Sequence, residues 1–252
     1  MAEIVTLHTA AAGEKPGFCR TPTAVDILNA LGFCYKYRKM GCIVGGPGVG
    51  KSTAIAEYAR ENRDATVCRM TKATTRMQPG LARIVNALGG YVATQMGSAD
   101  LAEEAKNRLC GVYRPQLLIL DEAQHMDDEL LEAMRDLFDE SGAGIVLVGS
   151  SELPERWEAK SAARRRKWAQ LTSRLTVWLD VPSGQPEDVV ALCDHHGIAG
   201  KRSRDLLTRA ASVDGGLRNI AVRLDIAWNL ANGAAIELCH LETAELIIGG
   251  RK

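Results

Sequence analysis

The sequence predicts an α/β protein in which a parallel sheet is flanked by helices, followed by a small helical domain. Three observations support this fold class. Short apolar runs of strand length alternate with segments of helical pattern, a glycine-rich run separates the first such strand from the next helix, and the end of the chain contains helical patterns only. Strands that alternate with helices are typical of a parallel sheet covered on both faces.

The individual elements follow from hydrophobic periodicity and from turn residues. A helix is expected from Thr21 to Lys39, where apolar residues recur at helical spacing behind a Thr-Pro start. Strands are expected at 41–44, 66–70, 116–120, 144–148 and 176–181. Helices are expected at 53–61, 81–88, 99–109 and 129–138. After the linker PSGQPED, further helices are expected at 187–195, 203–213, 217–232 and 241–248.

Composition limits the possible functions. The 252 residues, 46% of them hydrophobic, suffice for one sizeable core and a small second domain. Because the formal net charge is zero, any DNA-binding surface must be a local patch. The seven scattered cysteines form no CxxC pair and indicate a reducing cytoplasm. Neither a membrane span nor a secretion signal is expected.

The run GGPGVGKS fits the pattern G-x-x-x-x-G-K-[ST] at every position and stands between a predicted strand and a predicted helix. Glycines let backbone amides face phosphates, while Lys51 can reach the β- and γ-phosphates of ATP and the Ser52 hydroxyl can ligate Mg²⁺. A chance glycine turn is the alternative. The residues expected to contact the nucleotide in this segment are Gly45, Gly46, Pro47, Gly48, Val49, Gly50, Lys51, Ser52 and Thr53.

Two carboxylates follow the apolar strand of LLILDEAQH. In a doubly wound sheet the carboxyl end of this strand lies beside the phosphate loop. Asp121 is therefore expected to hold the magnesium ion and contact the nucleotide, and Glu122 to polarise the attacking water. Capping of the next helix is the alternative. Ser150, at the end of the strand in IVLVGSS, is expected to orient the water, although serines are also common in turns.

Two arginines are candidates for contact with the γ-phosphate. Arg174 in AQLTSRL precedes the last predicted strand of the core, and Arg218 in DGGLRN opens a helix of the tail. An arginine from a neighbouring subunit can stabilise the charge of the transition state, and one from the helical tail can sense ATP. Solvated surface residues are the alternative.

A basic segment, SAARRRKWAQ, is the candidate DNA contact. Seven basic and three acidic residues occur between Glu155 and Asp180. The tentative DNA-binding residues are Lys72, Arg76, Arg164, Arg165, Arg166 and Lys167, and a solvated loop is the alternative. The acidic block from Asp127 to Glu140 is most simply an exposed helix face. The alternative is a surface that repels DNA or meets a basic neighbour.

Five segments together resemble one family, the target-selection ATPases of phage Mu-type transposition within the AAA+ class, related to the ATPases of Tn7-type and Tn5053-type elements. The resemblance runs from about Thr21 to Ile248. It is carried, in order, by GGPGVGKSTAIAEYAR, LLILDEAQHM, IVLVGS, AQLTSRL and GGLRNIAVRLDIA. It implies Lys51 and Ser52 as the phosphate-loop pair, Asp121 and Glu122 as the second motif, Ser150 as the sensor, Arg174 as the finger for the adjacent subunit and Arg218 as the lid sensor.

The resemblance also implies a domain organisation and a function. We expect a loose arm over 1–20, an AAA+ nucleotide-binding core over 21–181 and a helical lid over 187–252. The phage Mu protein has a helix-turn-helix domain ahead of its ATPase, whereas only some twenty residues precede Thr21 here, so DNA contact would rest on the core.

The expected function is that of a Mg²⁺-dependent ATPase in the cytoplasm of a bacterial host. The resemblance implies that it assembles as an oligomer or helical filament on double-stranded DNA and delivers target DNA to a transposase. One alternative is a secretion or remodelling ATPase that acts on a protein without DNA. Another is a module that holds ATP as a structural ligand.

Overall fold

A computed structural model describes residues 14–110, 116–157 and 162–249. The chain forms two compact units. The core unit comprises Asp26–Gly46 and Lys51–Val181, and the helical unit comprises Met1–Val25, Pro47–Gly50 and Pro182–Lys252. Each unit is described by itself.

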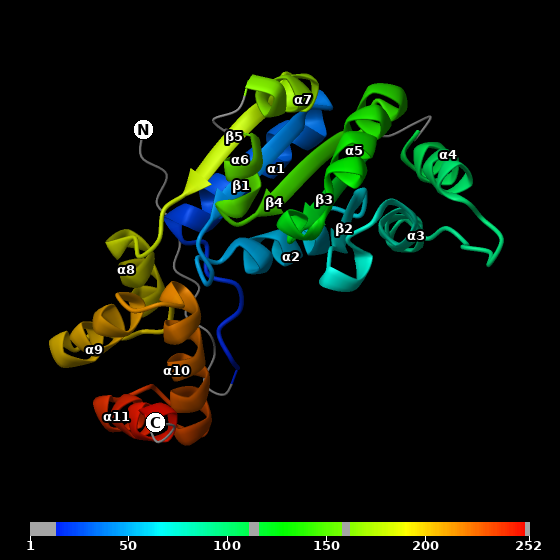
Figure 1. Cartoon of the computed structure of the whole chain (residues 1–252). Helices are drawn as coiled ribbons and strands as arrows, with labels where there is room; N and C mark the ends of the chain where they lie inside the picture. The colour runs from blue at the N-terminus through cyan, green and yellow to red at the C-terminus, as the bar shows by residue number, and fades with distance from the viewer. Residues whose placement is uncertain (1–13, 111–115, 158–161, 250–252) are drawn as a thin grey trace, which may run out of the picture. The chain divides into compact units, whose positions relative to one another are not determined.

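Five parallel strands form the sheet of the core unit, in the order β2-β3-β4-β1-β5 (Figure 1). Their bounds are Met40–Gly45 for β1, Ala65–Arg69 for β2, Leu117–Asp121 for β3, Gly144–Gly149 for β4 and Leu175–Val181 for β5. The strands β1, β3 and β4 are buried along their whole length, as expected for apolar strands covered on both faces. The structure therefore confirms the predicted parallel α/β fold.

Helices cover both faces of the sheet. The helices of the core are α1 (Pro22–Tyr37), α2 (Lys51–Glu61), α3 (Met77–Ala87), α4 (Ser98–Leu109), α5 (Asp128–Ser141), α6 (Glu152–Trp157) and α7 (Ala162–Thr172). Alternate residues of β1, including Met40 and Cys42, pack in one apolar cluster with α3, α4 and α5. A Cβ at Gly41 would lie 2.8 Å from the sulfur of Cys34, so α1 packs on the opposite face of β1.

All seven cysteines are free thiols. Burial raises the pKa of Cys34 and of Cys42 to about 12. Both thiols therefore stay neutral at physiological pH and pack as small apolar side chains in the core.

The helices α6 and α7 were not predicted from the sequence. Four consecutive cations, from Arg164 to Lys167, leave α7 without a clear apolar stripe, so hydrophobic periodicity gives no signal there. Two tryptophans hold the pair of helices instead: Trp157 and Trp168 are 5% and 2% exposed, and their ring centroids lie 6.4 Å apart. Burial of the two tryptophans thus stabilises α6 and α7, although their hydrophobic pattern does not predict helices.

The helical unit contains α8 (Pro186–His195), α9 (Lys201–Ala211), α10 (Gly216–Leu230) and α11 (Leu238–Gly249). They share a small core whose members include Leu207, Ile220 and Leu241. Among the described residues, no helix combines the length and apolar character needed to cross a membrane.

The predicted N-terminal arm falls partly outside the described residues, which begin at 14. Residues 14–20 form neither helix nor strand, but they contact α8 and α10 within the helical unit to which they belong. Lys15 forms an ion pair of 2.9 Å with Asp225 on α10, and the His195 ring lies 3.0 Å from the carbonyl oxygen of Gly17. This part of the segment is therefore attached to helices.

Candidate functional site

The phosphate loop joins the end of β1 to the start of α2. Gly48 and Gly50 have φ angles of 80° and 95°, which glycine adopts without the steric cost of a Cβ. The Lys51 ammonium donates hydrogen bonds to the carbonyls of Gly45, at 2.7 Å, and Gly46, at 2.8 Å. The first turn of α2 adds the positive end of a helix dipole. This arrangement places backbone amides and one ammonium where polyphosphate binds in such loops.

Gly48 also approaches the start of α10, within the helical unit to which both belong. A Cβ at Gly48 would lie 1.9 Å from the carbonyl oxygen of Gly215, so no larger residue fits. The backbone N–H of Arg218 donates to the Gly48 carbonyl at 3.2 Å, while the side chain of Arg218 is exposed. The predicted lid arginine therefore lies in the first turn of α10, and its backbone contacts the loop.

Ser52 and Asp121 meet at the carboxyl edge of the sheet. The Ser52 hydroxyl donates to Oδ2 of Asp121 at 3.0 Å, and Oδ1 of Asp121 accepts from the Glu122 backbone N–H at 3.0 Å. Asp121 is only 5% exposed. A hydroxyl and a carboxylate oxygen this close are the hard ligands that Mg²⁺ takes beside substrate phosphates. The two side chains thus fit the predicted magnesium role.

Glu122 follows in a strained conformation. Its φ of 59° and ψ of 38° lie in the left-handed region, which is costly for a residue with a Cβ. Its carboxylate accepts a hydrogen bond from the Gln124 amide and lies 3.6 Å from the Arg69 guanidinium. Gln124 and Arg69 thus hold the Glu122 carboxylate directly after the end of β3.

Ser150 is joined to Glu122 through Gln124. The Ser150 backbone N–H donates to Oε1 of Gln124 at 3.2 Å, and the same amide group donates to Glu122. The Ser150 hydroxyl is buried and has no hydrogen-bond partner among the residues that the structure describes. Sequence reasoning missed Gln124, whose place two residues after Glu122 in DEAQH was the only signal.

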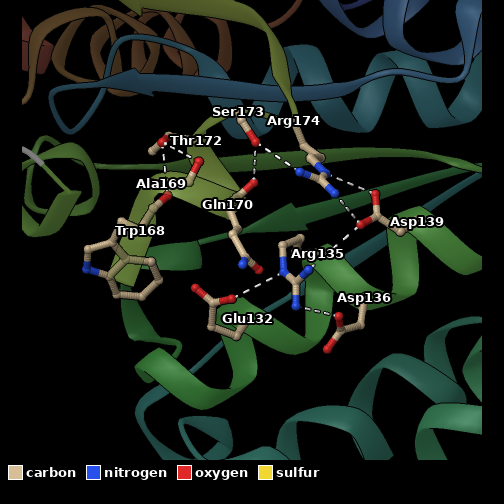
Figure 2. A network of polar contacts seen from close by, with 10 residues as sticks. All are labelled: Glu132, Arg135, Asp136, Asp139, Trp168, Ala169, Gln170, Thr172, Ser173 and Arg174. Carbon is tan, nitrogen blue, oxygen red and sulfur yellow. Dashed lines mark hydrogen bonds and ion pairs between the residues drawn. The ribbon is translucent and has the colours of Figure 1, made fainter. Parts of the chain in front are cut away.

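Arg174 lies beside the amino ends of the strands, whereas Ser52 and Asp121 lie beside their carboxyl ends. It precedes β5, whose first residue pairs with Met40 at the start of β1, whereas Asp121 ends β3. A strand of this length puts the two edges on the order of 20 Å apart. Figure 2 shows the Arg174 guanidinium facing the Asp139 carboxylate, with Nε to Oδ1 at 3.1 Å and Nη2 to Oδ2 at 3.0 Å. The hydrogen bond and charge of Asp139 raise the pKa of Arg174.

The candidate DNA-binding residues come from two segments. Lys72 opens a 3-10 helix (Lys72–Thr74), Arg76 directly precedes α3, and Arg164–Lys167 lie on α7. The side chains of Arg164 and Arg165 lie outside what the structure describes, whereas Arg166 and Lys167 are exposed. Arg76 and Lys167 line one cavity of about 930 Å³, together with Arg156, which sequence reasoning had not singled out.

The acidic block meets basic side chains of its own chain. Asp127, Asp128 and Glu129 line the same cavity. Lys167 Nζ lies 2.5 Å from Oδ2 of Asp128, and Arg156 pairs with its other oxygen. Partial burial raises the pKa of Asp128, but the hydrogen bonds from Lys167 and Arg156 outweigh this effect and lower it overall. Part of the positive charge at this cavity is therefore neutralised internally.

Comparison with known proteins gives one family match for each of two successive parts of the chain. A family model described as an AAA domain matches residues 35–157, and one described as the C-terminal part of the Mu B transposition protein matches residues 173–246. The chain has an AAA+ type of fold and resembles the Mu B transposition proteins. The ATP-dependent target DNA activator B of Escherichia phage Mu is 29% identical over 220 residues, which cover 87% of this chain and 69% of that protein.

A second relative and a solved structure agree with this placement. The Mu-like prophage FluMu DNA transposition protein B of Haemophilus influenzae is 28% identical over 212 residues, covering 81% of this chain and 70% of the relative. The crystal structure of Cdc6p from Pyrobaculum aerophilum superposes with a TM-score of 0.64 at 14% identity, covering 93% of this chain and 70% of that one. At this identity, the structural likeness supports the fold alone.

Proposed function

We propose that this AAA+ protein hydrolyses ATP with Mg²⁺. The observation that carries the proposal is the hydrogen bond between Ser52 and Asp121, which joins the phosphate loop to the strand that ends in Glu122. Ser52 and Asp121 would hold the magnesium ion, which offsets the negative charge of the phosphates when bound. Lys51 and the backbone N–H groups of the loop from Gly45 to Thr53, which Pro47 lacks, would hold the β- and γ-phosphates.

The remaining residues act on the attacking water and on the developing charge. Glu122 accepts a proton from the water after its carboxylate is released from Gln124, and Ser150 orients that water through its unpaired hydroxyl. Arg218 senses bound ATP from the start of α10. Arg174 stabilises the charge on the γ-phosphate of an adjacent subunit, since its own phosphate loop is at the other edge of the sheet.

The biological role that we propose is regulation of DNA transposition in the cytoplasm of a bacterial host. In this role the ATP-bound protein assembles on double-stranded DNA as an oligomer or helical filament and delivers target DNA to a transposase. The match of residues 173–246 to the Mu B C-terminal family supports it, as do relatives described as a target DNA activator and a DNA transposition protein. DNA contact would involve Lys72, Arg76 and the basic residues of α7.

Electron microscopy and co-sedimentation with duplex DNA test this role. The full chain with ATP should form assemblies on duplex DNA that are absent without nucleotide. The Glu122→Gln variant should keep these assemblies longer, because it binds ATP without splitting it. If ATP produces the same assemblies whether or not DNA is present, and none sediments with DNA, a remodelling ATPase with a protein partner replaces the transposition role.

A further inference from the structure

The guanidinium of Arg174 is held by two side chains of its own chain. Asp139 accepts from Nε and Nη2, forming two parallel hydrogen bonds on one edge of the group, and the Ser173 hydroxyl accepts from Nη1 at 3.0 Å (Figure 2). The Ser173 hydroxyl donates in turn to the Gln170 carbonyl at 2.7 Å, near the end of α7. Two-bond pairs between arginine and carboxylate fix direction as well as distance. The side chain of Arg174 therefore has a set orientation although it is 36% exposed.

These contacts leave part of the guanidinium available to a ligand. The group carries five N–H hydrogens, and Asp139 and Ser173 accept three of them. Within the described parts of the chain, one hydrogen therefore remains on each Nη atom. Two neighbouring donors of this kind match two oxygens of a phosphate.

Asp139 is held in turn by α5. The Arg135 guanidinium reaches Oδ2 of Asp139 at 3.9 Å and pairs with Glu132 and Asp136, as Figure 2 shows. An aspartate in the last turn of a helix is opposed by the helix dipole. Arg135 and Arg174 offset this cost, so the carboxylate has a fixed place between two cations.

We propose that Asp139 is the positioning residue for Arg174: it presents the free edge of the guanidinium to the γ-phosphate bound by an adjacent subunit. The inference rests on the proposed role of Arg174 as a finger in trans. Asp139 itself touches no nucleotide in this proposal. It acts by keeping the orientation of the Arg174 side chain fixed before the subunits meet. The guanidinium then need not be ordered again at each turnover.

The variant Asp139→Asn tests this assignment in an ATPase assay of the full chain with duplex DNA. The amide keeps the shape of the side chain but turns one acceptor into a donor, which breaks the two-bond fork. We expect kcat to fall on the order of 10- to 100-fold, since a catalytic group misplaced by about 1 Å loses up to roughly that factor. The affinity for a fluorescent ATP analogue should stay unchanged. Asp136→Asn is the matched control, because Asp136 pairs with Arg135 and not with Arg174 among the described contacts.

The same substitution in a protein that also carries Arg174→Lys separates a positioning role of Asp139 from a merely structural one. In the Arg174→Lys background no two-bond fork can form, so Asp139→Asn should lower kcat by less than about threefold. Asp139→Glu, which retains both acceptor oxygens, should keep more turnover than Asp139→Asn. An equal loss in the arginine and lysine backgrounds, or equal kcat for the Asn and Glu variants, overturns the assignment.

The two levels of the proposal fail in different ways. If Arg174→Ala hydrolyses ATP at the normal rate, the finger itself is wrong, whatever Asp139 does. If Arg174→Ala is inactive while Asp139→Asn equals Asp136→Asn and the unaltered protein, the finger stands and only the role of Asp139 is refuted.

Discussion

Lys51 lies folded onto the loop from which it projects, because its ammonium donates to the carbonyls of Gly45 and Gly46. These carbonyls have the same polarity as phosphate oxygens but carry only partial charge. A triphosphate would therefore compete well for the ammonium, since hydrogen bonds between ionised partners are about twice as strong as neutral ones. The contacts seen here keep the side chain close to the place where its ligand binds.

Removing this ammonium should weaken nucleotide binding without unfolding the protein. For Lys51→Ala we expect the affinity for a fluorescent ATP analogue to fall by at least about tenfold, corresponding to the loss of roughly 1.5–3 kcal/mol for a hydrogen bond to a charged group. Lys201→Ala, which removes an exposed lysine from α9, should bind as the unaltered protein does. Unchanged affinity for Lys51→Ala would refute the site.

For single residues, the sequence predicted roles where the functional residues are close to one another along the chain. Lys51, Ser52, Asp121 and Glu122 belong to two short motifs, whose residue types and spacing suffice to predict roles. Gln124 and Asp139 depend on partners far along the chain, Ser150 and Arg174, which lie 26 and 35 positions away. Asp139 also fell just beyond the predicted helix, which was expected to end at Phe138.

At the level of helices and strands, the five strands were predictable, because short apolar runs bounded by turn residues usually form strands in an α/β chain. The ends of the helices were harder to predict than the strands. The helix α5 continues to Ser141, where Gly142 ends it with a φ of 65°, and these last residues add no apolar side chain to the pattern. The helices α6 and α7 escaped prediction because burial of Trp157 and Trp168, not periodicity, stabilises them.

The charge on α7 leads to a prediction about DNA. Replacing Arg164, Arg165, Arg166 and Lys167 by alanine should lower the affinity for duplex DNA and flatten the log–log salt dependence. The slope should change by about 0.9 for each phosphate that the variant no longer neutralises, because fewer counterions are released. Fluorescence anisotropy at several salt concentrations measures both quantities.

Asp128 provides the opposing variant for this experiment. Because Asp128 pairs with Lys167 and Arg156, Asp128→Asn should free both cations and raise DNA affinity. An unchanged salt slope in the alanine variant, together with unchanged affinity in Asp128→Asn, would show that α7 is a solvated helix face and not a DNA contact.

For the whole molecule, the parallel sheet separates the two halves of the proposed chemistry. Ser52, Asp121 and Glu122 lie at its carboxyl edge and Arg174 at its amino edge, on the order of 20 Å away. No side chain spans that distance, so one core cannot bring Glu122 and Arg174 to the same phosphate. If both act in hydrolysis, the active unit is a junction between two subunits.

A mixing experiment tests this consequence directly. Arg174→Ala should bind ATP but not turn it over, because an arginine at the γ-phosphate can contribute about 10³ to 10⁵ in rate. Glu122→Gln should also bind ATP without splitting it, since it lacks the base in its own site. In an equal mixture, an intact Glu122 meets an intact Arg174 at about a quarter of randomly formed junctions, so the mixture should regain up to about that share of the activity.

The control mixture combines Lys51→Ala with Glu122→Gln. Both changes damage the nucleotide site of their own subunit, so no junction in that mixture is complete and activity should stay at the level of the separate variants. Regain in the first mixture but not in the second assigns Arg174 to the neighbouring site and shows that hydrolysis requires assembly. If cross-linking shows mixed assemblies and the Arg174→Ala and Glu122→Gln mixture still regains nothing, Arg174 does not act across the junction, and its pair with Asp139 serves only to join α5 to the start of β5.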